Sequence, residues 1–344
     1  MDFKRTAFAL ALGTAGGAVF AWAGAPLAWL MGAMITTTLA TLGGARPEIP
    51  GPLRTVMVAV LGIMLGSTFS PELADQLASW GAGIGVMAGV IAILMVVGIA
   101  YLRGVAGYDP VTAYYSAAPG GITSMSLIGE SLGADLRIVS LGHATRILVV
   151  VSTIPLWYRL AEHVEVPVVP NMGMALSALT LEEAGVLIAL GVVGVPIAKL
   201  LRIPTPGLIG PMILSAITHL LGWVEIGPPN ELVAAAQVVV GAAIGCRFVG
   251  LSFREVRTIM AHAAAVALLY VAVAAIAGWL SAPFVGVSQT AMVLALSPGG
   301  LAEMSLIALA IGIETAFVSS MHILRIMGIV LLAPVAYRVM ARFT

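Results

Sequence analysis

The stretch PGGITSMSLI at residues 119–128 returns in the same chain as PGGLAEMSLI at residues 298–307, so the two copies are offset by 179 (298 − 119). One offset kept without a gap over about forty residues indicates an internal duplication. Both copies interrupt a hydrophobic run with Pro-Gly-Gly and place one arginine in the middle of the next run. The same offset relates His143 to His322, Arg146 to Arg325, Pro155 to Pro334, and Tyr158-Arg159 to Tyr337-Arg338.

The composition is that of a membrane protein. Of the 344 residues, 60% are hydrophobic and 9% are charged, and apolar runs of about twenty residues recur, which is typical of a polytopic all-α membrane protein. The net charge is zero and the basic residues are scattered, so no nucleic-acid partner is indicated. The single cysteine, Cys246, excludes a disulfide framework and a CxxC metal or redox site.

The first apolar run, Thr6 to Ala23, follows Lys4 and Arg5 and resembles a signal peptide. The second half has an apolar run in the same place, residues 184–200, where no signal peptide can lie. We therefore expect the first run to be a true membrane span.

Two further landmarks repeat. LMGAMI at residues 30–35 corresponds to LIGPMI at 208–213, and the Gly-x-x-x-Gly spacing of residues 62–66 returns at 241–245. Small residues at such positions let helix backbones approach closely in membranes. Helix packing is sufficient to explain them, with a substrate contact as the alternative.

Each half contains six apolar segments. We expect a first transmembrane repeat over residues 1–160, a linker over 161–182 and a second repeat over 183–344. The segments lie near residues 6–24, 27–42, 53–69, 80–102, 110–130 and 136–158, and again near 184–200, 204–222, 231–247, 259–281, 287–311 and 316–337.

The loop charges predict that the two repeats are inverted. Cytoplasmic loops collect Lys and Arg; the loop with Arg46 and Arg54 is basic, and Glu225 and Glu231 fall at the equivalent place in the second half. Conversely, the acidic loop with Glu72 and Asp75 corresponds to Arg247, Arg254 and Arg257. Inversion requires an odd number of crossings, so we expect about five spans and one broken or re-entrant Pro-Gly-Gly element per repeat. Both termini would then be cytoplasmic, in an inner membrane.

The Pro-Gly-Gly segments are the candidate binding elements. Proline removes a backbone donor and glycine permits unusual dihedral angles, so we expect a helix to stop here. A helix that restarts after the glycines would direct its free amides at a cavity, which favours an anion. The candidate residues are Pro119, Gly120, Gly121, Pro298, Gly299 and Gly300, with the hydroxyls of Ser124, Ser126 and Ser305.

Arg146 and Arg325 lie deep in their apolar segments, and an intramembrane arginine indicates a functional site. Two interpretations remain open: each arginine caps the free carbonyls of a broken helix, or the pair clamps a carboxylate or similar anion. His143 and His322 lie three residues earlier on the same helix face. They are either packing residues bonded to a backbone carbonyl or participants in proton coupling.

Glu303 is the acid inside the second motif, and its counterpart in the first motif is Ser124. The duplication has therefore diverged at this position. Glu303 either forms an ion pair with Arg325 or carries a proton that couples transport.

The paired LMGAM and LIGPM stretches, Pro-Gly-Gly motifs and arginine-bearing segments resemble the AbrB family of bacterial inner-membrane proteins, whose members carry an AbrB duplication. The resemblance covers nearly the whole chain. Members are often labelled ammonia monooxygenase or regulator of gene expression, and neither label implies a mechanism for these residues. The family is distinct from the small soluble DNA-binding regulator of the same name.

These patterns favour a secondary transporter of a small anionic or zwitterionic solute, with proton or sodium coupling and elevator-like movement by analogy. We expect no enzyme, cofactor or metal, because a copper monooxygenase would need clustered ligands. A membrane sensor that affects gene expression through a partner protein is the alternative. A homodimer in contact with membrane lipid is expected, while substrate identity and direction of transport stay open.

Overall fold

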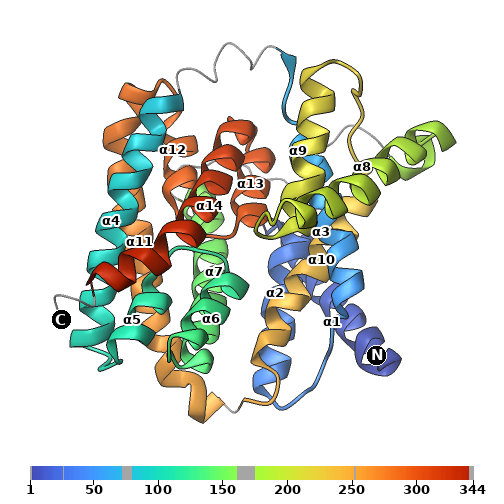
Figure 1. Cartoon of the computed structure of the whole chain (residues 1–344). Helices are drawn as coiled ribbons and strands as arrows, with labels where there is room; N and C mark the ends of the chain where they lie inside the picture. Colours follow the sequence, from blue (N-terminus) through green and yellow to red (C-terminus); the bar gives the residue numbers. More distant parts are fainter. Residues whose placement is uncertain (1, 26, 72–79, 161–174, 252, 341–344) are drawn as a thin grey trace. The chain divides into compact units, whose positions relative to one another are not determined.

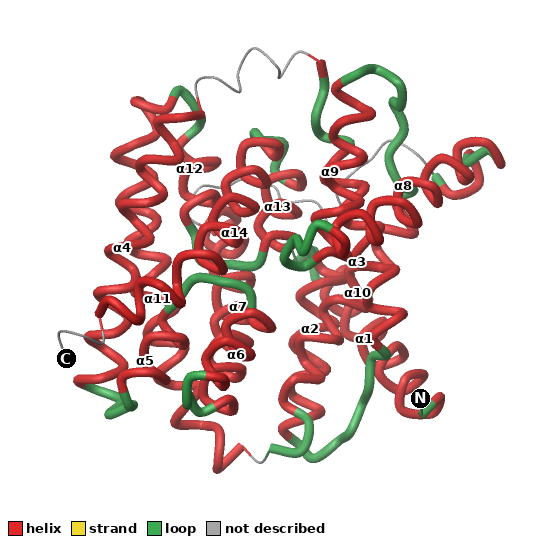
Figure 2. The backbone as a smooth tube through the Cα atoms, viewed as in Figure 1, coloured by secondary structure: helices red, strands yellow, loops and turns green. Residues whose placement is uncertain are grey.

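The computed structural model describes residues 2–25, 27–71, 80–160, 175–251 and 253–340 (Figure 1). These residues form helices and loops without a strand, which confirms the all-α class (Figure 2). The helices are α1 (Phe3–Trp22), α2 (Ala28–Leu42), α3 (Gly51–Gly66), α4 (Gly81–Gly104), α5 (Pro110–Ala117), α6 (Ile122–Ser131), α7 (Leu136–Leu160), α8 (Leu181–Leu200), α9 (Pro206–Leu220), α10 (Asn230–Gly245), α11 (Phe253–Val285), α12 (Gln289–Leu296), α13 (Leu301–Ala310) and α14 (Thr315–Met340), with short 3-10 turns at Leu176–Ala178 and Cys246–Phe248.

Six of the described helical stretches are long and apolar enough to cross a membrane. The six stretches are Gly81–Gly104, Leu136–Arg159, Leu181–Leu200, Asn230–Phe248, Val256–Val285 and Thr315–Val339.

The expected acidic loop with Glu72 and Asp75 lies outside the described residues, as do residues 161–174 of the expected linker. Helix α8 begins at Leu181, inside that expected linker.

The chain forms two compact units, and each unit draws on both sequence repeats. Unit 1 comprises Met1–Leu77, Val151–Glu255 and Ser305–Ala316, whereas unit 2 comprises Ala78–Val150, Val256–Met304 and Phe317–Thr344. Helices α1–α3 and α8–α10 therefore lie in unit 1. Both Pro-Gly-Gly motifs lie in unit 2.

Unit 1 is built on close backbone crossings at glycines. Helix α1 crosses α2 where a Cβ built at Gly16 would lie 2.6 Å from the Gly32 carbonyl oxygen. Helix α8 crosses α9 in the same way, since a Cβ at Gly194 would lie 2.7 Å from the Pro211 nitrogen. Any side chain at these glycines would separate the helices.

The Gly-x-x-x-Gly pairs also lie at helix crossings in unit 1. A Cβ at Gly66 would lie 2.5 Å from the Met212 carbonyl oxygen, where α3 packs on α9. A Cβ at Gly245 would lie 2.7 Å from Thr37 Cβ, where α10 packs on α2. These contacts confirm the helix-packing interpretation of the motif.

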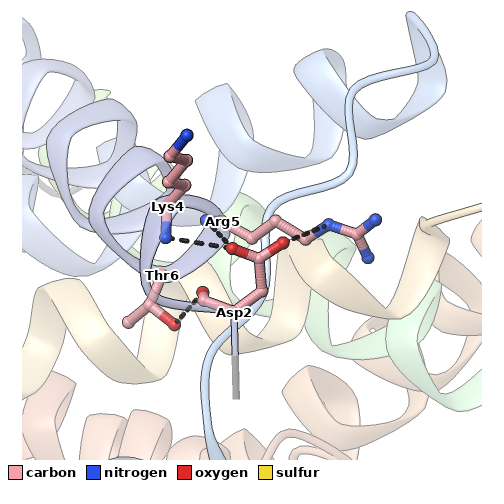
Figure 3. A network of polar contacts seen from close by, with 4 residues as sticks. All are labelled: Asp2, Lys4, Arg5 and Thr6. Atoms are coloured by element: carbon pink, nitrogen blue, oxygen red, sulfur yellow. Dashed lines mark hydrogen bonds and ion pairs between the residues drawn. The ribbon is translucent and has the colours of Figure 1, made fainter.

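Helix α1 begins at a side-chain cap. The Asp2 carboxylate accepts hydrogen bonds from the backbone N–H groups of Lys4 and Arg5 at 3.1 and 3.4 Å (Figure 3). Arg5 Nε lies 3.2 Å from the same carboxylate, and the Thr6 hydroxyl donates to the Asp2 carbonyl at 3.2 Å. Helix α1 then packs against α2 and α10, so the first apolar run is part of the folded unit.

Unit 2 contains the first segments of two interrupted helices, α5 and α12, and both segments begin at a side-chain cap. Asp109 caps α5 through the N–H groups of Val111 and Thr112. Ser288, its counterpart in the second repeat, caps α12 through the N–H of Ala291. Each helix runs for about two turns before the Pro-Gly-Gly motif interrupts it. The predicted helix breaks are therefore confirmed in both copies.

Candidate functional site: two broken helices held by buried arginines

The two breaks separate α5 from α6 and α12 from α13. Ala118 and Gly121 have extended backbones, with φ, ψ of −56°, 125° and −74°, 139°. The glycines of both motifs have negative φ, so the expectation that they supply unusual dihedral angles is wrong. Gly120 and Gly299 instead leave no room for a side chain, because a Cβ at Gly120 would lie 2.9 Å from Met125 Cγ, and one at Gly299 would lie 2.6 Å from Met304 Cε.

Buried side chains bind the backbone carbonyls that the first break leaves open. Arg146 on α7 donates from Nη1 to Ala118 O at 3.0 Å and from Nη2 to Gly120 O at 3.2 Å. The Tyr270 hydroxyl on α11 donates to Ala117 O at 2.9 Å. A helix C-terminus carries a partial negative charge, so donors and a cation are favourable here.

The second break repeats this arrangement. Arg325 on α14 donates from Nη1 to Ser297 O at 2.6 Å and from Nη2 to Gly299 O at 2.7 Å. Each acceptor is the repeat counterpart of an acceptor in the first break, so the duplication extends to individual hydrogen bonds. The sequence left two interpretations open for each arginine, a carbonyl cap and an anion clamp. Both arginines make the contacts of the carbonyl cap.

The two histidines bind equivalent carbonyls but differ at the other ring nitrogen. His143 Nε2 lies 2.9 Å from Tyr115 O, and His322 Nε2 lies 3.0 Å from Leu294 O. His143 Nδ1 lies 2.9 Å from Arg146 Nη2; since guanidinium only donates, Nδ1 accepts and Nε2 carries the proton. His322 Nδ1 has no hydrogen-bond partner among the described residues.

Capping leaves part of each guanidinium unused. Arg146 is 4% exposed and Arg325 is 3% exposed, and neither Nε has a hydrogen-bond partner in the described part of the chain. The hydrogen bonds of Arg146 go to neutral groups, so a positive charge persists beside the first break and favours an anion.

Glu303 lies in the first turn of α13 and is 7% exposed. Its carboxylate folds back over Gly300, where any Cβ would collide with it. A carboxylate in this place is favourable because a helix N-terminus carries a partial positive charge. At the equivalent Ser124 the side chain is half-buried, so the two breaks differ in charge at this position.

The other predicted hydroxyls face the interior. Ser126 on α6 and its equivalent, Ser305 on α13, are 6% and 0% exposed. Ser126 Oγ has no hydrogen-bond partner within the described residues. These serines follow the breaks by about one turn of helix.

Sequence reasoning missed Tyr270, whose position in the first repeat corresponds to Ile91. The signal was a lone tyrosine in the apolar run of residues 259–281, because a buried tyrosine hydroxyl usually has a partner. Within the described residues, no group of three or more His, Cys, Asp or Glu residues could hold a metal ion.

Comparison with known proteins shows the family to which this chain belongs. The family model described as "Transition state regulatory protein AbrB" matches residues 29–341. The chain belongs to the AbrB family. It is 27% identical to "Uncharacterized protein YhjN" of Bacillus subtilis (strain 168), covering 96% of this chain and 92% of the relative, and 25% identical to "Putative regulator AbrB" of Escherichia coli (strain K12), covering 92% and 91%. No solved structure matches.

Proposed function

We propose that this AbrB-family protein is a secondary transporter of a small anionic or zwitterionic solute. The observation that supports the proposal most is the pair of helix breaks, each held open by a buried arginine at equivalent carbonyls. Secondary transporters place discontinuous helices at the solute site, where half-helix ends face solute and coupling ion. Irregular backbone at membrane depth persists where protein or a water-filled cavity satisfies it.

The proposed topology is two inverted repeats, each with about five spans and one broken element, in an inner membrane with both termini cytoplasmic. It rests on the loop charges of the sequence. We further propose elevator-like alternating access in which unit 2, which holds both breaks, carries the solute. A homodimer is part of the same analogy.

Glu303 and His322 are the proposed coupling residues. Glu303 is a buried acid at the second break, and His322 has one ring nitrogen without a partner among the described residues. His143 is less suited to exchange protons, because both of its ring nitrogens are engaged as those of a neutral imidazole. Proton coupling at the second break would use the position where the copies have diverged.

Uptake into proteoliposomes tests the function. We expect an imposed pH gradient to drive uptake of labelled small carboxylates or amino acids by the wild type. Glu303→Gln should abolish the gradient-driven component, because a glutamine cannot carry the coupling proton. Equal uptake by Glu303→Gln at every pH would refute the coupling role.

A membrane-embedded regulator that acts through a partner protein is the second candidate. The name of the Escherichia coli relative, "Putative regulator AbrB", favours it. An absence of uptake for every solute and gradient tested, together with a change in gene expression on deletion, would favour this candidate.

A further inference from the structure

An apolar groove lies between α3 and α8 in unit 1. It has about 480 Å³ of free volume, within the range of about 300–1,000 Å³ that is typical of small-molecule sites. It extends from Thr55 to Ile63 on α3 and from Leu187 to Pro196 on α8, which corresponds to about 12–14 Å at the rise of an α-helix. The groove is therefore large and long enough to hold part of an alkyl chain.

The groove offers almost no polar contact. Among the described residues that line it, only Thr55 has a polar side chain, and its hydroxyl donates to the Gly51 carbonyl at 3.0 Å. Ile188 and Val192, along the rim, are 64% and 65% exposed. A polar group buried here would lose its hydrogen bonds with water, so the part of a ligand that lies in the groove must be apolar.

The corresponding helix pair of the first repeat is packed more closely. Helices α1 and α10 are the counterparts of α8 and α3, and Gly13 corresponds to Gly191 at the offset of 178 (208 − 30) that relates LMGAMI to LIGPMI. A Cβ built at Gly13 would lie 3.2 Å from Val238 Cγ1 and 3.5 Å from Ala242 Cβ. At Gly191 the nearest atom of another described helix is Ile63 Cδ1, at 3.9 Å. The two repeats therefore differ at the groove.

Basic side chains surround one end of the groove. A Cβ at Gly207, at the start of α9, would lie 3.3 Å from Thr55 Cγ2. The turn between α8 and α9, which contains Arg202, therefore lies beside the first turn of α3, which contains Arg54. Lys199 lies in the last turn of α8. These three basic side chains are exposed, and none of them forms an ion pair with a described residue.

Acidic side chains lie at the opposite end, beside the start of α8. Glu182 is in the first turn of α8. Glu231 on α10 accepts a hydrogen bond from the backbone N–H of Leu176, just before α8, at 2.9 Å. An amphiphile with an anionic head is therefore favoured in one orientation, with its head at Lys199 and Arg202.

Arg202 has a backbone conformation that non-glycine residues rarely adopt. Its φ is 55°, and Gly24, its counterpart in the first repeat, has a φ of 63°. The counterpart of Lys199 is Ala21. The second repeat therefore carries two positive charges here that the first repeat lacks, and it keeps one of them at a position where glycine would be less strained.

We propose that this groove binds one acyl chain of an anionic phospholipid, with the lipid phosphate at Arg54, Lys199 and Arg202. Basic side chains between membrane helices attract anionic lipid headgroups, and the apolar lining matches the acyl chain. The lipid site goes beyond the proposed transport function and does not depend on it.

Native mass spectrometry of the full chain in detergent tests the site, with phosphatidylglycerol and phosphatidylcholine of identical acyl chains as the probes. The two lipids have the same tails, but only phosphatidylglycerol has a net negative charge. We expect the wild type to retain phosphatidylglycerol at lipid concentrations at which it does not retain phosphatidylcholine. Equal retention of the two lipids would overturn the proposal, because it would show general contact with lipid.

Gly191→Leu tests the groove itself. The atom nearest to a Cβ at Gly191 is 3.9 Å away, whereas a Cβ at Gly185, on an exposed position of the same helix, meets no described atom within 4 Å. A leucine at position 191 should therefore fit and fill the groove, and Gly185→Leu is the matched control. We expect Gly191→Leu to lose phosphatidylglycerol and Gly185→Leu to keep it. A Gly191→Leu protein that melts like the wild type and retains the lipid as Gly185→Leu does would refute the groove as the site.

Arg202→Gly tests the headgroup contact without filling the groove. It installs the residue of the first repeat, which suits the positive φ, so the variant should fold. We expect Arg202→Gly to weaken phosphatidylglycerol binding by about fivefold and to leave phosphatidylcholine binding unchanged. Arg103→Gln, which removes an exposed charge from the last turn of α4, is the control.

Two further outcomes would contradict the lipid site. An Arg202→Gly protein that binds phosphatidylglycerol as tightly as Arg103→Gln would exclude the headgroup contact. A wild type that retains no phosphatidylglycerol, but forms a dimer that Gly191→Leu converts to a monomer, would assign the groove to a second copy of this chain.

Discussion

At the scale of single residues, the glycines of the two motifs have different neighbours although their sequences match. A Cβ at Gly300 would collide with the Glu303 carboxylate, whereas no described heavy atom lies within 4 Å of a Cβ at Gly121. Gly121 also has a backbone conformation that alanine adopts readily. Gly300 and Gly121 therefore offer a test substitution and its matched control within one chain.

We predict that Gly300→Ala destabilises the protein by about 1–2 kcal/mol, through displacement of Glu303 from the start of α13. Gly121→Ala should change the stability by less than about 0.5 kcal/mol. Denaturation of the purified protein in detergent measures the stability change of both variants. In the Glu303→Ala background the cost of Gly300→Ala should shrink; an unchanged cost would show that Glu303 is not what alanine displaces.

The two helix caps at Asp109 and Ser288 give a pH-dependent prediction. Burial raises the pKa of Asp109, but hydrogen bonds from Thr112 and Val111 outweigh burial, so the pKa lies below its ordinary value. A lowered pKa means that the carboxylate stabilises the fold above the unfolded pKa of about 4 and loses this contribution as the pH falls through the folded pKa.

Asp109→Ala should therefore cost about 1 kcal/mol at neutral pH, and the difference from the wild type should narrow below about pH 4. Ser288→Ala is the control, because a hydroxyl does not titrate in this range. Melting temperatures of Asp109→Ala, Ser288→Ala and the wild type, measured across pH, test this prediction. A gap for Asp109→Ala that stays constant with pH would contradict the capping account.

At the scale of helices, the glycine crossings of unit 1 determine how closely the backbones pack. A Cβ at Gly66 would lie 2.5 Å from the Met212 carbonyl oxygen, whereas a Cβ at Gly85, on an exposed face of α4, meets no described atom within 4 Å. We predict that Gly66→Ala lowers stability by about 1–3 kcal/mol through overpacking. Gly85→Ala should be neutral or stabilising by up to about 1 kcal/mol. Equal effects in thermal denaturation would contradict the close crossing.

Sequence patterns predicted the helices and breaks well because hydrophobic length and Pro-Gly-Gly are local signals. The choice between anion clamp and carbonyl cap at Arg146 could not be made from sequence, since it depends on which atoms of α5 the guanidinium meets. The role of Gly120 and Gly299 was misjudged for a similar reason. Steric contact with Met125 or Met304 is not visible in a linear pattern.

At the scale of the whole molecule, the units cut across the repeats. Unit 1 contains the glycine-crossed helices of both halves, and unit 2 contains both Pro-Gly-Gly breaks. The sequence showed the duplication but not the division into these two units, because a repeat pattern does not say which helices of the two repeats pack together. We propose that the two Pro-Gly-Gly breaks expose the solute path to each side of the membrane in turn.

Labelling of a cysteine at position 126 tests that claim most directly. Ser126 follows the first break, and its hydroxyl has no partner among the described residues; Cys246→Ser removes the native thiol. We predict that an impermeant thiol reagent modifies Ser126→Cys from either side of a proteoliposome, and that an imposed solute or pH gradient shifts the preferred side. Modification from one fixed side under every gradient, or from neither, would contradict alternating access at the broken helices.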